Sequence, residues 1–174
     1  MRKILLLTLL LFCVSGLFAQ NYPVIMNNGT ILINTGIGFG WPVTYEDKDK
    51  ATNRVDGPLC PPLTVSFDAA LPIAGLPLTV GITIGYLMET LKQGCFYILP
   101  VAARIAYHLP FNVPRLDTYA VLTLGAAIVF DAESKFWFGL GAGGRYFFLP
   151  YMGAYLELGF GNVQNITFGL SFKI

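Results

Sequence analysis

The feature that most limits how this chain can fold is a two-residue alternation of large apolar and small side chains. In the stretch 136–148, FWFGLGAGGRYFF, one row of alternate positions holds Gly139, Gly141, Gly143 and Arg145, and the other row is largely apolar. Successive side chains point to opposite faces of a β-strand. The stretch therefore predicts a strand with one apolar face and one face of small or polar residues.

The same alternation recurs along the chain and predicts eight strands in total. The other seven stretches are 30–41, 63–71, 78–87, 96–108, 118–130, 152–161 and 165–174. An even number of strands is what a closed antiparallel barrel with both termini at one end requires. The predicted connections also alternate: short turns containing proline follow the second, fourth and sixth strands, and the loops 42–62, 88–95, 131–135 and 161–164 follow the others.

Composition favours a membrane barrel over a soluble one. Only 12% of the 174 residues are charged and 55% are hydrophobic, whereas a soluble domain carries about 25% charged residues. After the first twenty residues no stretch offers ~20 uninterrupted apolar residues for a membrane helix, while a membrane strand needs only ~9–11. We therefore predict an all-β fold, an eight-stranded antiparallel up-and-down transmembrane β-barrel. The alternative is a soluble lipid-binding barrel, which would turn the row of glycine and threonine toward water.

The first residues have the pattern of a secretory signal peptide. A basic start (Arg2, Lys3) precedes an apolar run and a small-residue exit, so we expect a signal peptide at 1–19 and one barrel domain at 20–174. An uncleaved anchor helix is the alternative, but the apolar run is short for one. Loss of Arg2 and Lys3 leaves nine basic against ten acidic side chains, and this balance predicts no nucleic-acid partner.

Charged residues on the predicted inner face form the candidate site. The lumen of an eight-stranded barrel is only wide enough for side chains, and an unpaired buried charge is costly. We therefore predict a polar cluster in the lumen, with Arg145 and Glu157 at similar heights on adjacent strands. Its members are Asp68, Arg104, Arg145 and Glu157. The cluster is interpreted as a structural network that fills the lumen; the alternative is a gate in a narrow, transient pore.

The remaining reactive side chains do not suggest catalysis or metal binding. His108 is the only histidine, and its sequence neighbours Tyr107 and Leu109 offer no nucleophile, which a hydrolase would need beside the base. Two cysteines and a distant histidine are too few ligands for a metal site. We expect no cofactor, no metal and no enzymatic activity.

Two cysteines follow the signal peptide. Cys60 closes the first long connection and Cys95 closes the second, so both fall at the same, outer end of the predicted barrel. In an oxidising envelope such a pair is expected to form a disulfide. Two free thiols are the alternative, because the third strand lies between the second and the fourth.

Three motifs together resemble a known group of proteins. They are the signal peptide, the hairpin FGLGAGGRYFFLPYMGAYLELGFG at 138–161, and an aromatic strand at the C-terminus. The chain resembles the small eight-stranded OmpA-, OmpX- and OmpW-like barrels of the bacterial outer membrane. The resemblance implies insertion in the outer-membrane bilayer with the help of the barrel-assembly machinery.

The same resemblance implies three kinds of function. The first is a structural or surface-interaction role, in which outer loops, chiefly 42–62, contact a host or envelope partner. The second is a porin-like narrow channel, or a conduit for small apolar molecules. The third, less favoured by the residues around His108, is an enzyme that modifies lipid A.

Overall fold

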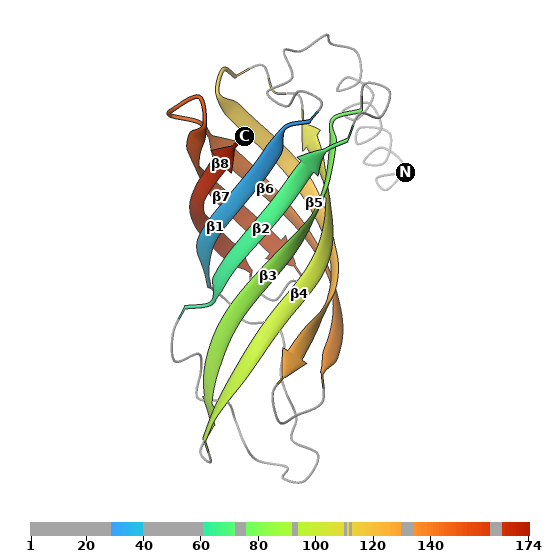
Figure 1. Cartoon of the computed structure of the whole chain (residues 1–174), viewed down its shortest axis with the longest axis vertical. Helices are drawn as coiled ribbons and strands as arrows, with labels where there is room; N and C mark the ends of the chain where they lie inside the picture. The colour runs from blue at the N-terminus through green and yellow to red at the C-terminus, as the bar shows by residue number, and fades with distance from the viewer. Residues whose placement is uncertain are drawn as a thin grey trace, which may run out of the picture.

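The computed structural model describes residues 29–39, 61–71, 76–91, 94–109, 111, 113–129, 134–160 and 165–174. Within them the chain forms eight strands in one closed antiparallel barrel (Figure 1). The strands are β1 (Ile31–Phe39), β2 (Leu63–Ala70), β3 (Leu78–Leu91), β4 (Gly94–Leu109), β5 (Leu116–Val129), β6 (Lys135–Tyr146), β7 (Met152–Phe160) and β8 (Ile166–Lys173). This confirms the predicted fold class. The described residues contain no helix that is long and apolar enough to cross a membrane.

The barrel closes because the last strand pairs with the first. The β1–β8 register runs from Leu32 opposite Lys173 to Phe39 opposite Ile166. At the end that carries the chain termini, Ile31 and Ile174 exchange two backbone hydrogen bonds of 2.9 Å. Closure leaves no strand edge unpaired, which is the condition for a β-sheet to lie in a bilayer.

The predicted strand boundaries agree with the structure to within a few residues, with one clear exception. The stretch 88–95 is predicted as a loop, but most of it is strand. β3 and β4 continue to pair from Met88 opposite Tyr97 as far as Leu91 opposite Gly94. The prediction was wrong here because it followed side-chain alternation, which weakens beyond Leu87, whereas the hairpin is held by backbone hydrogen bonds.

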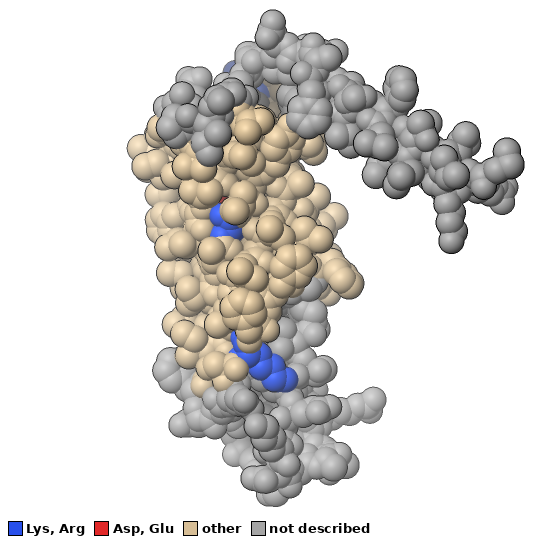
Figure 2. Space-filling view, turned by 90° about the vertical axis from the view of Figure 1, so that its right-hand side faces the viewer, with Lys and Arg blue, Asp and Glu red and all other residues tan. Residues whose placement is uncertain are grey.

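The two faces of the wall are as the alternation predicts. On β6 and β7, Leu140, Leu156 and Leu158 are half exposed on the outside, whereas Arg145 is completely buried. Figure 2 shows a side wall that is almost entirely free of charged side chains. Aromatic rings also pair on the outer surface, with Phe39 stacked on Phe168 at 5.7 Å. Outward-facing apolar side chains of this kind are suited to contact with lipid.

The glycine row of β6 leaves room for large side chains from other strands. A Cβ atom on Gly143 would overlap the ring of Tyr119, which crosses the lumen from β5. The next residue, Gly144, faces outward, and a Cβ there would have no atom nearer than 3.9 Å. The glycine at 143 is therefore required by the packing of the lumen, whereas the glycine at 144 is not.

We expect Gly143→Ala to destabilise the barrel and Gly144→Ala to have little effect. The added methyl group at 143 would displace the Tyr119 ring, and overpacking of this kind costs about 1–3 kcal/mol. The check is the temperature at which the folded band converts to the unfolded band in a detergent gel. Equal conversion temperatures for the two variants would show that the lumen accommodates the extra methyl group.

Candidate functional site

The lumen is occupied by a network of buried charged side chains with Arg145 at its centre. Arg145 extends from β6 and is fully buried. Its Nη1 donates to Asp117 Oδ2 at 2.8 Å, its Nη2 donates to Asp68 Oδ2 at 3.2 Å, and its Nε donates to Asn34 Oδ1 at 3.1 Å. The guanidinium also lies 4.0 Å from the centroid of the Tyr119 ring. One arginine thus links strands β1, β2, β5 and β6.

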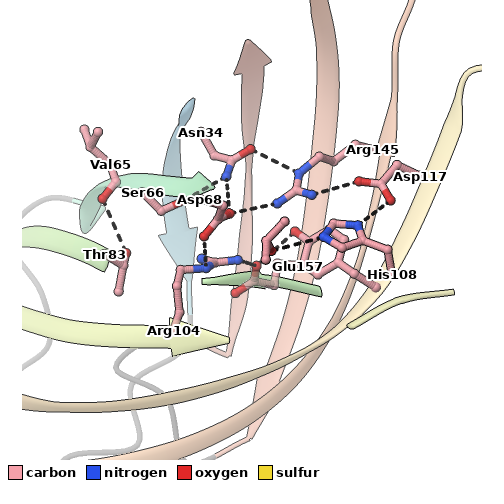
Figure 3. Close-up of polar contacts among 12 residues, drawn as sticks. Asn34, Val65, Ser66, Asp68, Thr83, Arg104, His108, Asp117, Arg145 and Glu157 are labelled. Carbon is pink, nitrogen blue, oxygen red and sulfur yellow. Dashed lines mark hydrogen bonds and ion pairs between the residues drawn. The ribbon is translucent and has the colours of Figure 1, made fainter. Parts of the chain in front are cut away.

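A second arginine extends the network toward the middle of the barrel (Figure 3). Arg104 of β4 places Nε 2.9 Å from Asp68 Oδ1, an ion pair without the alignment of a hydrogen bond. Its Nη2 donates to Glu157 Oε2 of β7 at 2.9 Å. The hydroxyl of Tyr119 donates to the same carboxylate oxygen at 2.9 Å. Asp68 therefore joins the two arginines, and each of the three carboxylates in the network contacts at least one of them.

His108 connects to the network through Asp117. Its Nδ1 lies 2.6 Å from Asp117 Oδ1, and its Nε2 lies 3.1 Å from Thr79 Oγ1. This order of carboxylate, imidazole and hydroxyl is the one that activates a nucleophile in hydrolases. Here, however, the exposed fractions of Thr79, His108 and Asp117 are 1%, 5% and 4%. The arrangement is a buried chain of hydrogen bonds on the inner wall, with no exposed nucleophile.

The end of the lumen near the chain termini is filled by apolar side chains. Leu32 and Phe147 pack together and are 0% and 3% exposed. Lys173, which the sequence places on the inner face of the last strand, has its Nζ 5.2 Å from the centroid of the Phe147 ring. Among the described residues, this layer and the charge network occupy the part of the lumen nearest the termini.

The opposite half of the lumen holds a cavity with a mixed lining. It encloses about 530 Å³ of atom-free space, including its open mouth. The charged residues on its wall are Arg104 and Glu157, and the indole of Trp137 forms part of it. Threonine side chains at positions 64, 83, 123 and 167 form much of the remaining cavity wall. The charge network therefore separates a packed half of the lumen from a partly open half.

The structure brings all four predicted cluster residues, Asp68, Arg104, Arg145 and Glu157, into one connected network. The partners of Glu157 differ from those expected from the sequence, which placed Arg145 and Glu157 at similar heights on adjacent strands. Across β6 and β7, Arg145 lies opposite Tyr155 and Gly143 lies opposite Glu157. The hydrogen-bond partners of Glu157 are Arg104 and Tyr119 rather than Arg145.

Sequence reasoning missed Asn34, Asp117, Tyr119 and Thr79 as members of this site. Asp117 and Tyr119 share the inward parity of Thr123 on β5. Tyr119 already lies in the predicted strand 118–130, and extending that strand by one residue would have added Asp117. Thr79 was missed because only residues near His108 in sequence were considered. Its hydroxyl comes from the adjacent strand, which the sequence neighbours of a histidine do not reveal.

The predicted disulfide is not tested, because Cys60 lies outside the described residues. The signal peptide at 1–19 and the loop 42–60 also lie outside them. Among the residues that the structure describes, no group of three or more His, Cys, Asp or Glu side chains is placed to hold a metal ion.

The closed register, the lipid-facing apolar wall and the filled polar lumen define the fold of the small transmembrane β-barrels found in outer membranes. Similar solved structures share this fold. A de novo designed transmembrane β-barrel has 19% identity and a TM-score of 0.51 over 86% of this chain and 98% of that one. The N-terminal β-barrel domain of Pseudomonas aeruginosa OprF has 16% identity and a TM-score of 0.50 over 85% of this chain and 98% of that one.

A third similar structure is Ail, the attachment invasion locus protein of Yersinia pestis. It has 12% identity and a TM-score of 0.44 over 84% of this chain and 96% of that one. No protein-family model matches the chain, and no curated protein sequence matches it. At these levels of identity the comparisons show the fold of the chain.

We expect Arg145→Ala to destabilise the barrel strongly. Removing the guanidinium leaves Asp68 and Asp117 buried without their shared partner, and breaking a buried ion pair in this way costs about 3–5 kcal/mol. The matched control is Arg115→Ala, because Arg115 is exposed in the connection between β4 and β5. Urea unfolding of both variants in phospholipid vesicles, followed by tryptophan fluorescence, measures the difference. A similar loss of stability in both would contradict the central role of Arg145.

Proposed function

We propose that this protein is an integral outer-membrane β-barrel that serves as a rigid anchor for surface-exposed connections, chiefly 42–62. The observation that carries the proposal is the packed half of the lumen on the side of the termini. Arg145 is completely buried and bonded to three other strands, and Leu32 and Phe147 pack beneath it. A barrel that is filled in this way is suited to holding its loops in place, and less suited to passing solutes.

The outer wall supports insertion in a bilayer. Outward positions of the described strands carry leucine, isoleucine, phenylalanine and valine, and the buried arginines point inward. An arginine turned toward lipid at the midplane would cost roughly 2–4 kcal/mol. In this proposal the bilayer is that of the outer membrane, and the protein reaches it through the signal peptide at 1–19 and the barrel-assembly machinery. The interaction partner is a host or envelope component that contacts the outer loops.

Surface exposure of the connection 42–62 is tested by epitope insertion. We expect an epitope placed after Asp49 to be bound by antibody on intact cells, because this connection joins β1 and β2 at the end opposite the termini. The control is the same epitope placed after Ile73, in the connection of β2 and β3 at the other end. It should be bound only after the outer membrane is permeabilised. Exposure of the second epitope alone would mean that the barrel has the opposite orientation.

One observation favours a second candidate, a narrow channel. The cavity occupies the outer half of the lumen and reaches Arg104 and Glu157. If the network opens at that point, an aqueous path could extend further through the barrel. Arg104 and Glu157 would then act as a gate, in which a 2.9 Å ion pair holds the closed state.

Conductance in planar bilayers separates the two candidates. The anchor function predicts no conductance from the wild-type barrel and none from Glu157→Ala. A channel predicts a conductance that changes in Glu157→Ala, because Arg104 and Tyr119 lose their shared acceptor. Glu157→Gln separates the two parts of this contact, since an amide oxygen retains the acceptor but loses the negative charge of the ion pair.

We propose, further, that the barrel is not an enzyme. Thr79, His108 and Asp117 have the bonding order of a hydrolytic triad, but they are almost completely buried and none of them lines the cavity. A lipid acyl chain would need to reach the Thr79 hydroxyl through packed residues. The arrangement is better suited to fixing the ends of β3, β4 and β5 against one another.

A further inference from the structure

The cavity in the outer half of the lumen is a feature that the anchor function does not use. It lies on the side of Arg104 and Glu157 that faces away from the chain termini. Its wall residues Thr64, Thr167 and Trp137 stand within the first three residues of β2, β8 and β6. These strand ends lie at the mouth of the barrel opposite the termini, and in the orientation of the proposed function, on which this step rests, a small molecule outside the cell has the shorter route to this cavity.

The cavity wall is rich in hydrogen-bond acceptors. Three threonine hydroxyls on it donate their hydrogen atoms to backbone carbonyls of neighbouring strands. The bonds run from Thr64 to Gly36 at 3.4 Å, from Thr83 to Val65 at 3.4 Å, and from Thr123 to Gly139 at 3.2 Å. A hydroxyl that has used its hydrogen atom still has oxygen lone pairs that accept. A ligand that presents hydrogen-bond donors to these three oxygens is therefore favoured in this cavity.

The floor and one wall of the cavity add two further requirements. Arg104 and Glu157 are bonded to each other at 2.9 Å, so their charges offset and favour a neutral ligand. Trp137 offers an apolar ring, which packs well against carbon-bound hydrogens. Its Nε1 is buried and has no acceptor among the described residues.

We propose that this cavity binds the neighbouring hydroxyl groups of a small neutral polyol or of the edge of a sugar. Such groups donate to the threonine oxygens and carry no charge, while their carbon chain contacts the Trp137 side chain. The enclosed part of the cavity holds about three to five water molecules. That space suits a three-carbon polyol or one side of a sugar ring rather than a larger ligand.

The first experiment is a fluorescence titration of the full barrel refolded in detergent. The variant Trp41→Phe leaves Trp137 as the single tryptophan of the chain. It is titrated with glycerol, with methyl glucoside, and with 1,2-dimethoxyethane, a diether that has no donor hydrogen. We expect a saturable change in Trp137 emission with glycerol or methyl glucoside and none with the diether. Saturation by glycerol alone identifies a free polyol as the ligand, and saturation by methyl glucoside identifies a sugar edge.

A matched pair of variants tests whether the binding occurs in the lumen. Thr123→Val removes a hydroxyl that lines the cavity, and we expect it to weaken binding by about three- to tenfold, the worth of one hydrogen bond. Thr118→Val removes a hydroxyl that also donates to a carbonyl of the adjacent strand, but from the outward face of the same strand. It should leave the affinity unchanged. The absence of saturation with both polyols, an equal response to the diether, or an equal loss in both variants would overturn the proposal.

Discussion

The structure depends on the need to pair every charge that the narrow lumen encloses. Two arginines and three carboxylates stand inside a barrel that has room only for side chains. Arg145 satisfies this need by bonding to side chains from three other strands, and Arg104 by bonding to two. Because the partners are distant in sequence, the network can form only when the barrel is closed. It therefore stabilises the closed register specifically, beyond what the backbone hydrogen bonds of each strand pair provide.

The small residues of the inner face follow from the same constraint. An eight-stranded lumen cannot hold a large side chain from every strand at one height. Tyr119 occupies the space in front of Gly143, and the Arg145 guanidinium lies 4.0 Å from the centroid of the Tyr119 ring. The alternation of glycine with large apolar residues on β6 thus serves two needs. The apolar row contacts lipid, and the glycine row gives room to the network that other strands supply.

Much of the fold could be predicted from the sequence. In a membrane barrel the outward side chains of every strand contact lipid, so apolar residues recur at every second position, and this pattern is visible within each strand. The eight strands, their inward and outward faces and the inward direction of Asp68, Arg104, Arg145 and Glu157 are all visible in the alternation. The partners within the lumen are not, because the strands tilt and residues that are neighbours across the barrel have no relation in sequence. Glu157 accordingly bonds to Arg104, 53 positions away, rather than to an arginine on the strand beside it. The hairpin at 88–95 was missed for a different reason, since backbone pairing continues where side chains no longer alternate.

The division of the lumen into two halves has a consequence for function. On the side of the termini, Leu32, Phe147 and the network around Arg145 leave little space, and this half gives the barrel its rigidity. On the other side, threonine hydroxyls line the wall, and three of them donate their hydrogen atoms to strand carbonyls, so among the described residues the only charged side chains on this wall are the paired Arg104 and Glu157. Arg104 and Glu157 lie at the boundary and contact both halves. In the two proposals made above, a small neutral molecule occupies the open half without disturbing the ion pairs, and the barrel combines a rigid anchor with a binding site at its outer mouth.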